Sequence, residues 1–202
     1  KRTAYMILII LGIISMLGDM VYESGRGIAP DYMKFLGASA FVVGVVSGAG
    51  EFLGYGTRLI SGALSDRTRA YWVFIFAGYG LILAIPLIGL TYSLEIVVVL
   101  LLLERVGKAL RSPSRDTVVS IVGKNVGSGK AFGIHEAVDQ TGAIIGPLLF
   151  SAALFFTANN YQVAFGLLLI PFVLMMIVIG YTYRRVGRAV DEEAQIQCSD
   201  QQ

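Results

Sequence analysis

The amino-acid sequence predicts an all-α membrane protein with six transmembrane helices. Three observations lead to this prediction. Hydrophobic residues make up 55% of the 202 residues, charged residues only 15%, and the mean hydropathy is +0.71, which is unusual for a soluble domain. Apolar runs of about 20 residues or more, the length that spans a bilayer as a helix, alternate with short polar segments. Most lysines and arginines fall in every second polar segment, as in multi-pass proteins.

The apolar runs place the helices in order along the chain. Prolines and polar clusters mark the expected ends and bends of these helices. We expect helices over residues 3–29, ending at Pro30; 39–64, after an outer turn over 31–37; 71–90, with a candidate bend at Pro86; 94–111, ended or bent by Pro113; and two more, sharing the charge-free run 140–183 and divided at 157–160.

The distribution of basic residues predicts the orientation in the membrane. One side receives Lys1, Arg2, Arg67, Arg69, Arg115, Lys124, Lys130, Arg184, Arg185 and Arg188, whereas only Lys34 falls clearly on the other. By the positive-inside rule, both termini are expected in the cytoplasm and the bundle in the cell (inner) membrane. We assign residues 1–183 to the bundle and 184–202, basic and then acidic and glutamine-rich, to a mobile cytoplasmic tail or the start of a central linker. Because the first apolar run leads into charged residues and not into a cleavage site, the first helix is expected to be retained.

Charges within the first two helices are candidate functional groups, because a charge in a membrane is costly. Asp19, Glu23 and Arg26 are spaced by four and three residues and therefore share one face of the first helix. One interpretation is a cluster near the outer water interface, where Arg26 neutralises a carboxylate; Asp19 lies deeper and is the better functional candidate. On the second helix, Glu51 lies midway and Arg58 follows seven residues later on the same face.

The fourth helix carries a stripe of charge. Within an arc of about 120°, at 100° per residue, lie Glu104, Arg105, Lys108, Arg111 and Arg115. We expect the last three side chains to extend to the cytoplasmic surface along their apolar stems. Arg105 lies deeper, next to Glu104, and is the functional candidate of the stripe.

The segment from Gly62 to Arg69, with sequence Gly-Ala-Leu-Ser-Asp-Arg-Thr-Arg, is expected to form a charged hairpin at the membrane surface. Its residues Gly62, Asp66, Arg67 and Arg69 resemble the loop signature between the second and third helices of the major facilitator superfamily. In that family the loop is regarded as a latch between inward- and outward-facing states. Gly62 is expected to allow a close helix approach, and Asp66 to cap or bond the neighbouring helix end. The alternative is an ordinary positive-inside hairpin.

Two further segments resemble signatures of the same family. The run from Glu104 to Asp116 is similar to its helix-four arginine signature, which is linked to proton transfer. The fifth helix carries His135, Glu136 and Asp139, and then Gly142, Gly146 and Pro147, which are similar to the antiporter signature of helix five, although Phe150 and Ser151 stand where that signature ends in two glycines. The two glycines are expected to permit close packing, and Pro147 to bend the helix.

The resemblance implies a secondary active transporter of a small solute, coupled to protons and working by alternating access between two six-helix bundles. Members usually have twelve helices, so this chain corresponds to one half, similar to the N-terminal one. Its expected partners are the solute, membrane lipid and a second bundle, either another copy in a homodimer or a missing C-terminal half, with no nucleic acid. Pathway or proton-coupling roles are expected for Asp19, Glu23, Glu51, Arg58, Glu104, Arg105, His135, Glu136 and Asp139. Asp139 and Glu136 are expected to titrate or to pair with cations of the fourth helix, such as Arg105.

Other functions stay open at this point. A membrane scaffold or assembly subunit would use the same charges only to pair helices, a channel would need a continuous water path, and a drug exporter would belong to the same superfamily. An enzyme is not expected, because no nucleophile, base and orienting group fall together. Neither a metal nor another cofactor is expected, because the chain has a single histidine, His135, and a single cysteine, Cys198.

Overall fold

The protein is all-helical in its described part. The computed structural model describes the backbone of residues 2–124 and 126–199 and the side chains of residues 4–124 and 126–187, so Lys1 and the side chains of Arg2, Arg188 and Cys198 lie outside the described residues. The elements are α1 (Arg2–Phe35), α2 (Ala40–Thr68), α3 (Tyr71–Gly80), the 3-10 helix η1 (Leu81–Leu83), α4 (Ala84–Ile88), α5 (Leu94–Gly123), α6 (Ser128–Phe156), α7 (Tyr161–Leu167) and α8 (Leu169–Ser199). The all-helical class is therefore confirmed.

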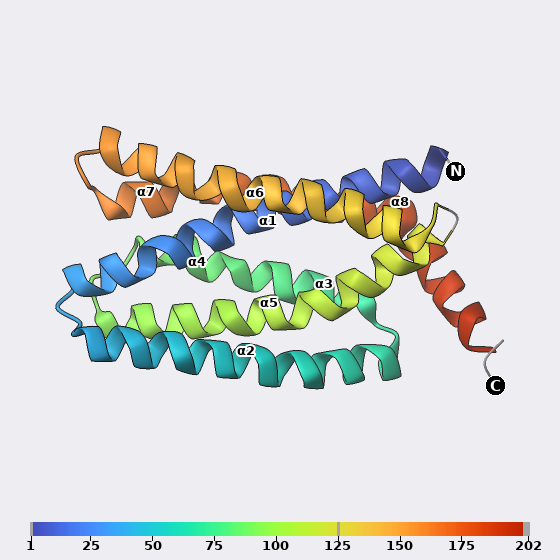
Figure 1. The fold of residues 1–202 in the computed structure, drawn as a ribbon, viewed down its shortest axis with the longest axis horizontal. Coiled ribbons are helices and arrows are strands. Elements are labelled where there is room, and N and C mark those ends of the chain that lie inside the picture. Colours follow the sequence, from blue (N-terminus) through green and yellow to red (C-terminus); the bar gives the residue numbers. More distant parts are fainter. Residues whose placement is uncertain (1, 125, 200–202) are drawn as a thin grey trace.

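The long helices run side by side along one axis (Figure 1). α6 packs along α1, α2 along α5, and α1 also contacts α5, so these four helices form a continuous layer. α3 packs on α5 and α8 on α1. The connections α2–α3 and α5–α6 lie at the same end of the bundle as the start of α1 and the end of α8 (Figure 1).

Four helical segments are long and apolar enough to cross a membrane, judged by length and composition: Ala4–Phe35, Tyr71–Ile88, Ser128–Phe156 and Tyr161–Gly187. α2 and α5 have sufficient length, 29 and 30 residues, but are not among these four. The six expected crossings therefore stay a prediction.

Two prolines that were expected to end helices lie inside them. α1 continues through Pro30 to Phe35, and the chain turns only at Gly37, where φ is 92°. α5 continues through Pro113 to Gly123. Pro113 has no N–H to donate to the carbonyl of Ala109, and the Ser61 hydroxyl of α2 donates to that oxygen instead, at 2.7 Å. The neighbouring helix α2 thus supplies the hydrogen bond that the proline removes. Because of this donor, α5 does not end at Pro113.

The expected hairpin over 62–69 is also wrong in its extent. α2 remains helical to Thr68, and the reversal takes place at Arg69, whose φ of 55° and backbone N–H bond to the Ser65 carbonyl, 2.7 Å, close the helix. By contrast, the division at 157–160 is confirmed: Ala158 and Asn159 adopt positive φ, and Asn160 caps α7.

The ends of the remaining expected helices differ in detail. The third helix is divided into α3, η1 and α4, and the break precedes Pro86, which cannot donate to the Ile82 carbonyl. The backbone of α8 is helical to Ser199, whereas a mobile end was expected from residue 184. The secondary structure therefore does not mark the boundary at 184, and a tail or linker role for 184–202 stays a prediction.

α1 and α6 contact each other backbone to backbone. A Cβ atom added at Gly142 or Gly146 would overlap the carbonyl oxygens of Met16 and Met20, respectively. These glycines therefore allow the close packing that their spacing predicts. Pro147, one residue further on, lies inside α6.

The glycines of α2 behave differently. A Cβ at Gly62 would meet Pro113 only at an ordinary contact distance, 3.6 Å, so no close approach depends on this glycine. Gly44, Gly48 and Gly54 have no neighbour within 4 Å of such a Cβ among the described residues, whereas Gly50 faces Arg105. Among the described residues, Gly44, Gly48 and Gly54 therefore bring no neighbouring helix close to α2.

Candidate functional site

Charged side chains from α1, α2, α5 and α6 meet on one face of the bundle. The most enclosed contact joins Arg111 of α5 to Asp19 of α1, with Nη2 2.9 Å from Oδ1 and side-chain exposures of 1% and 9%. The Arg111 guanidinium also lies over the Tyr79 ring, 4.7 Å from its centroid. Asp19 was expected to line a polar pathway, and in this conformation it is held in a buried ion pair.

A second ion pair crosses from α5 to α6. Arg115 Nη1 lies 3.3 Å from Asp139 Oδ2 and 3.3 Å from the Ser15 hydroxyl, and its Nη2 lies 3.0 Å from Asp116. Asp139 therefore does pair with a cation of the fourth predicted helix, but the cation is Arg115 and not Arg105. Its other oxygen, Oδ1, is buried without a hydrogen bond to any described residue.

Arg105 binds Glu51 instead. Its Nη1 is 2.8 Å from Glu51 Oε1 and donates to the Tyr22 hydroxyl at 2.6 Å. Arg26 of α1 reaches the same Glu51 oxygen at 3.5 Å, and Glu23 at 3.9 Å. Arg26 thus neutralises carboxylates, as one interpretation of the sequence held. The buried Glu104 contacts Arg105 only at 3.8 Å.

The two remaining cations of this face are less firmly paired. Lys108 Nζ lies 3.5 Å from Glu23 and 3.6 Å from the centroid of the Tyr22 ring. Arg58 donates to the Ser112 hydroxyl at 3.3 Å, and no carboxylate of the described residues lies within 4.0 Å of it. Arg58 is the cation of this face for which the described part of the chain supplies no counter-ion.

His135 and Glu136 are neighbours in sequence but differ in environment. His135 is 1% exposed, and its Nε2 lies 3.3 Å from the Ser15 hydroxyl, which also bonds to Tyr79 at 2.9 Å. Glu136 is exposed and accepts a hydrogen bond from Gln140 at 2.7 Å. The expected pairing of Glu136 with a cation of α5 is therefore not found in the described residues.

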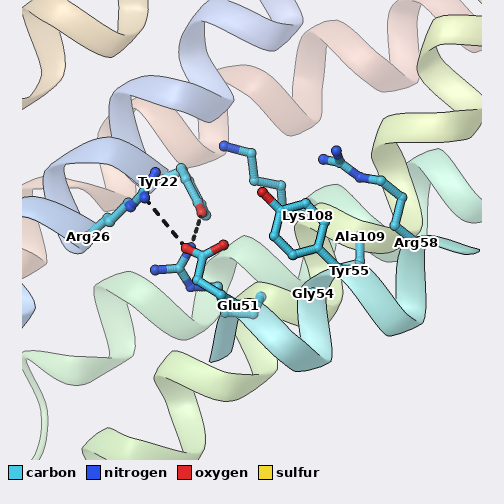
Figure 2. A pocket seen from close by; sticks show the side chains of 9 residues that line it. Tyr22, Arg26, Glu51, Gly54, Tyr55, Arg58, Lys108 and Ala109 are labelled. Atoms are coloured by element: carbon cyan, nitrogen blue, oxygen red, sulfur yellow. Dashed lines mark hydrogen bonds and ion pairs between the residues drawn. The ribbon is translucent and has the colours of Figure 1, made fainter. Parts of the chain in front are cut away.

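Two cavities open between these side chains. The first, of about 210 Å³, is shown in Figure 2 and is lined by Tyr22, Arg26, Glu51, Gly54, Tyr55, Arg58, Arg105, Lys108 and Ala109. The second, of about 340 Å³, is lined from all four helices by Asp19, Glu23, Arg58, Lys108, Ser112, Arg115, Glu136, Asp139, Gln140 and Ala143. Arg58 and Lys108 belong to both, so the cavities adjoin along these two side chains.

The expected gating residues lie away from this face. Asp66 and Arg67 are exposed near the end of α2, and neither Arg69 nor these two lines either cavity. The Asp66 side chain makes no hydrogen bond or ion pair with a described residue, so the expected cap or bond to a helix end is not present. A gating role therefore depends on contacts that this bundle alone does not make.

Several residues of the site were missed or misplaced by sequence reasoning. Lys108, Arg111 and Arg115 were expected to reach the cytoplasmic surface. The helix instead continues past Pro113 to Gly123, and all three lie within it and pair with carboxylates of α1 or α6. The helical spacing of residues on α1 could have indicated two of the missed polar residues. Ser15 precedes Asp19 by four residues and Tyr22 follows it by three, which places them on the same helix face. Ser112 follows Lys108 by four residues and falls within the arc of the α5 charges, whereas Tyr79 carried no comparable signal.

Comparisons with known proteins agree with this architecture. The family described as Major Facilitator Superfamily matches residues 3–197. Uncharacterized proteins of Mycobacterium bovis and Mycobacterium tuberculosis are 41% identical over 187 residues, which is 92% of this chain and 46% of theirs. A protein of Methanocaldococcus jannaschii, named as an uncharacterized MFS-type transporter, is 34% identical over 142 residues, 69% of this chain and 35% of that protein. The chain thus spans about half the length of the mycobacterial relatives.

Proposed function

The chain belongs to the major facilitator superfamily, and from this membership we propose that it forms one six-helix half of a secondary active transporter for a small solute. The superfamily consists of multi-pass membrane transporters and not of enzymes, which agrees with the prediction from the sequence that this protein is not an enzyme. Residues 3–197 match the family, and the mycobacterial relatives are about twice as long as the matched region. Both observations support one half of a larger pathway.

The charged face of α1, α2, α5 and α6 is the observation that carries this proposal. Its two cavities are lined by ionisable side chains, and hydrocarbon cannot solvate such groups. A second six-helix bundle, either a second copy or a missing C-terminal half, would cover the face and enclose the cavities as a central pathway. The solute would then bind near the middle of the membrane, between the two bundles.

Alternating access requires ion pairs that can break and form again. We place this role on Arg105–Glu51 and Arg115–Asp139, which join different helices beside the cavities. Protonation of Asp139 would remove the negative charge that holds Arg115, and its oxygen Oδ1 has no described partner that competes for a proton. Asp139 is therefore the proposed coupling site.

One end of the bundle carries the basic connections α2–α3 and α5–α6 together with both described ends of the chain (Figure 1). We propose that this end faces the cytoplasm and that the protein resides in the cell (inner) membrane, because cytoplasmic loops are enriched in lysine and arginine.

Replacement of Arg105 distinguishes a transporter from a scaffold. The protein at its natural length, with its second bundle, is reconstituted in liposomes, and uptake from a panel of labelled solutes is compared for wild type, Arg105→Gln and the exposed control Lys34→Gln. A carrier should lose at least about tenfold in flux with Arg105→Gln, because a charge-assisted hydrogen bond contributes about 1.5–3 kcal/mol. Elution volume and yield of the variant should be unchanged. Normal flux in Arg105→Gln would contradict a pathway role for Arg105. Absence of flux of every solute in the wild type would favour a scaffold, and turnover far above carrier rates would favour a channel.

A further inference from the structure

We infer that the solute carries an oxyanion group, a carboxylate or a phosphate, that binds between Arg58 and Lys108 in the first cavity. This inference rests on the proposed transport function and assigns the chemical class of its solute. It follows from the balance of charges around the cavity and from the way the lining residues are already paired.

The first cavity has an excess of positive charge. Its lining holds four cations, Arg26, Arg58, Arg105 and Lys108, and a single carboxylate, Glu51. Arg105 and Arg26 both contact the same Glu51 oxygen, at 2.8 and 3.5 Å. Two arginines thus already share the one carboxylate that the described residues contribute to this lining, and it pairs with neither Arg58 nor Lys108.

Arg58 lacks a counter-ion among the described residues. It lies on α2 ten residues before the end of that helix, about 15 Å at 1.5 Å per residue. Its described hydrogen bond goes to a neutral hydroxyl, that of Ser112, so most of its five N–H donors are available. Figure 2 shows no interaction between Arg58 and any other residue drawn. A guanidinium binds carboxylate or phosphate through two parallel hydrogen bonds, which makes an oxyanion the matching ligand.

Lys108 supplies the second positive charge. In Figure 2 the ends of Lys108 and Arg58 extend to the same side of the pocket, away from Glu51. The ammonium is held over the Tyr22 ring, 3.6 Å from the centroid, and reaches Glu23 only at 3.5 Å. An entering oxyanion would therefore meet a positioned ammonium whose own ion pair is long. Because Lys108 and Arg58 also line the second cavity, the bound anion would lie next to the cavity that contains Asp139.

The carboxylates around the cavities argue against a cationic solute. Asp19 is occupied by Arg111, Asp139 by Arg115, Glu51 by Arg105, and Glu23 by Lys108 and Arg26. Glu136, which has no described cation partner, lines only the second cavity and bonds to Gln140. The described residues thus offer Arg58, which has no carboxylate partner, beside Lys108, whose ion pair with Glu23 is long, and no unpaired carboxylate in the first cavity.

Binding of a matched set of small molecules tests this inference. Succinate, succinamide and 1,4-diaminobutane share a four-carbon chain but carry negative, zero and positive charge; inorganic phosphate serves as a second oxyanion probe. Affinities are measured by calorimetry on the purified protein at its natural length, in nanodiscs of phosphatidylcholine. Succinate or phosphate should bind, and Arg58→Gln should weaken that binding about ten- to hundredfold, since charge-assisted hydrogen bonds are lost. Arg58→Lys should retain part of the affinity, and the exposed Lys34→Gln should bind as wild type.

Three results would overturn the inference: equal binding of succinamide or diaminobutane, unchanged oxyanion binding in a folded Arg58→Gln variant, or loss of succinate and phosphate binding when phosphatidylglycerol replaces part of the lipid. The last result would assign the site to a lipid headgroup. Transport assays distinguish failure of the oxyanion-site inference from failure of the proposed transport function. Arg58-dependent oxyanion binding without flux of any solute would refute transport and leave the anion site standing. Flux of neutral or cationic solutes alone would refute the anion site and leave the proposed transport function standing.

Discussion

The buried pair Arg111–Asp19 allows a quantitative test of whether these charges contribute to the stability of the bundle. Removing one partner of a buried ion pair leaves an uncompensated charge, which costs about 3–5 kcal/mol. The geometry favours the upper part of this range, because Arg111 is 1% exposed and two of its nitrogens, Nε and Nη1, have no described hydrogen-bond partner. Asp19→Asn should therefore lower the free energy of unfolding by about 3–5 kcal/mol. The exposed Asp31→Asn, in a surface pair with Lys34, should cost less than about 1 kcal/mol.

A double-mutant cycle completes the test. Asp19→Asn combined with Arg111→Met removes both charges, and such replacements of buried pairs are often close to neutral, so the double variant should recover most of the loss. Unfolding is followed in mixed detergent micelles by the fluorescence of Trp72, which is the only tryptophan in the sequence and is buried. Losses that simply add in the double variant would refute the reasoning, because they would show that each residue acts through other contacts.

Three further perturbations have defined outcomes. Gly142→Ala should destabilise the bundle by about 1–3 kcal/mol, because its Cβ would overlap the Met16 carbonyl oxygen, whereas Gly133→Ala, which faces open space, should not; equal effects in the same unfolding assay would contradict the packing. Asp139→Asn removes the titrating group but keeps its shape, so a proton-coupled carrier should lose pH-driven accumulation in liposomes and retain solute exchange; persistent accumulation would move the coupling site to Glu51 or Asp19. Asp66→Asn should lower transport and leave unfolding unchanged, because an exposed residue at the end of α2 would act through contacts with the second bundle; normal transport would remove Asp66 from the gate.

The sequence was sufficient to predict which charges share a helix face. Helical spacing alone places Asp19, Glu23 and Arg26 together on α1 and Lys108, Arg111 and Arg115 together on α5, and the structure directs these faces toward one another. The division of the last two predicted helices was equally accessible, because a polar cluster interrupts a run too long for one crossing. These features depend on local periodicity, which one sequence contains.

Pairing between helices could not be predicted in the same way. Asp139 selects Arg115 and not Arg105 because of the relative axial positions of α5 and α6, and no spacing within either helix specifies that offset. The misplaced end at Pro113 has the same origin. Proline removes one hydrogen bond, but whether the helix ends depends on a donor from elsewhere, here the Ser61 hydroxyl.

The backbone contact between α1 and α6 has a mechanical consequence. At Gly142 and Gly146 no side chain separates the two helices, so there is no compressible layer that could absorb a sliding or bending displacement. A force applied at one end of this pair is therefore transmitted along its whole length. The pair α1–α6, which carries Asp19 and Asp139, should therefore move as a rigid unit. If the chain alternates as proposed, the movement should take place at the interface between the two bundles.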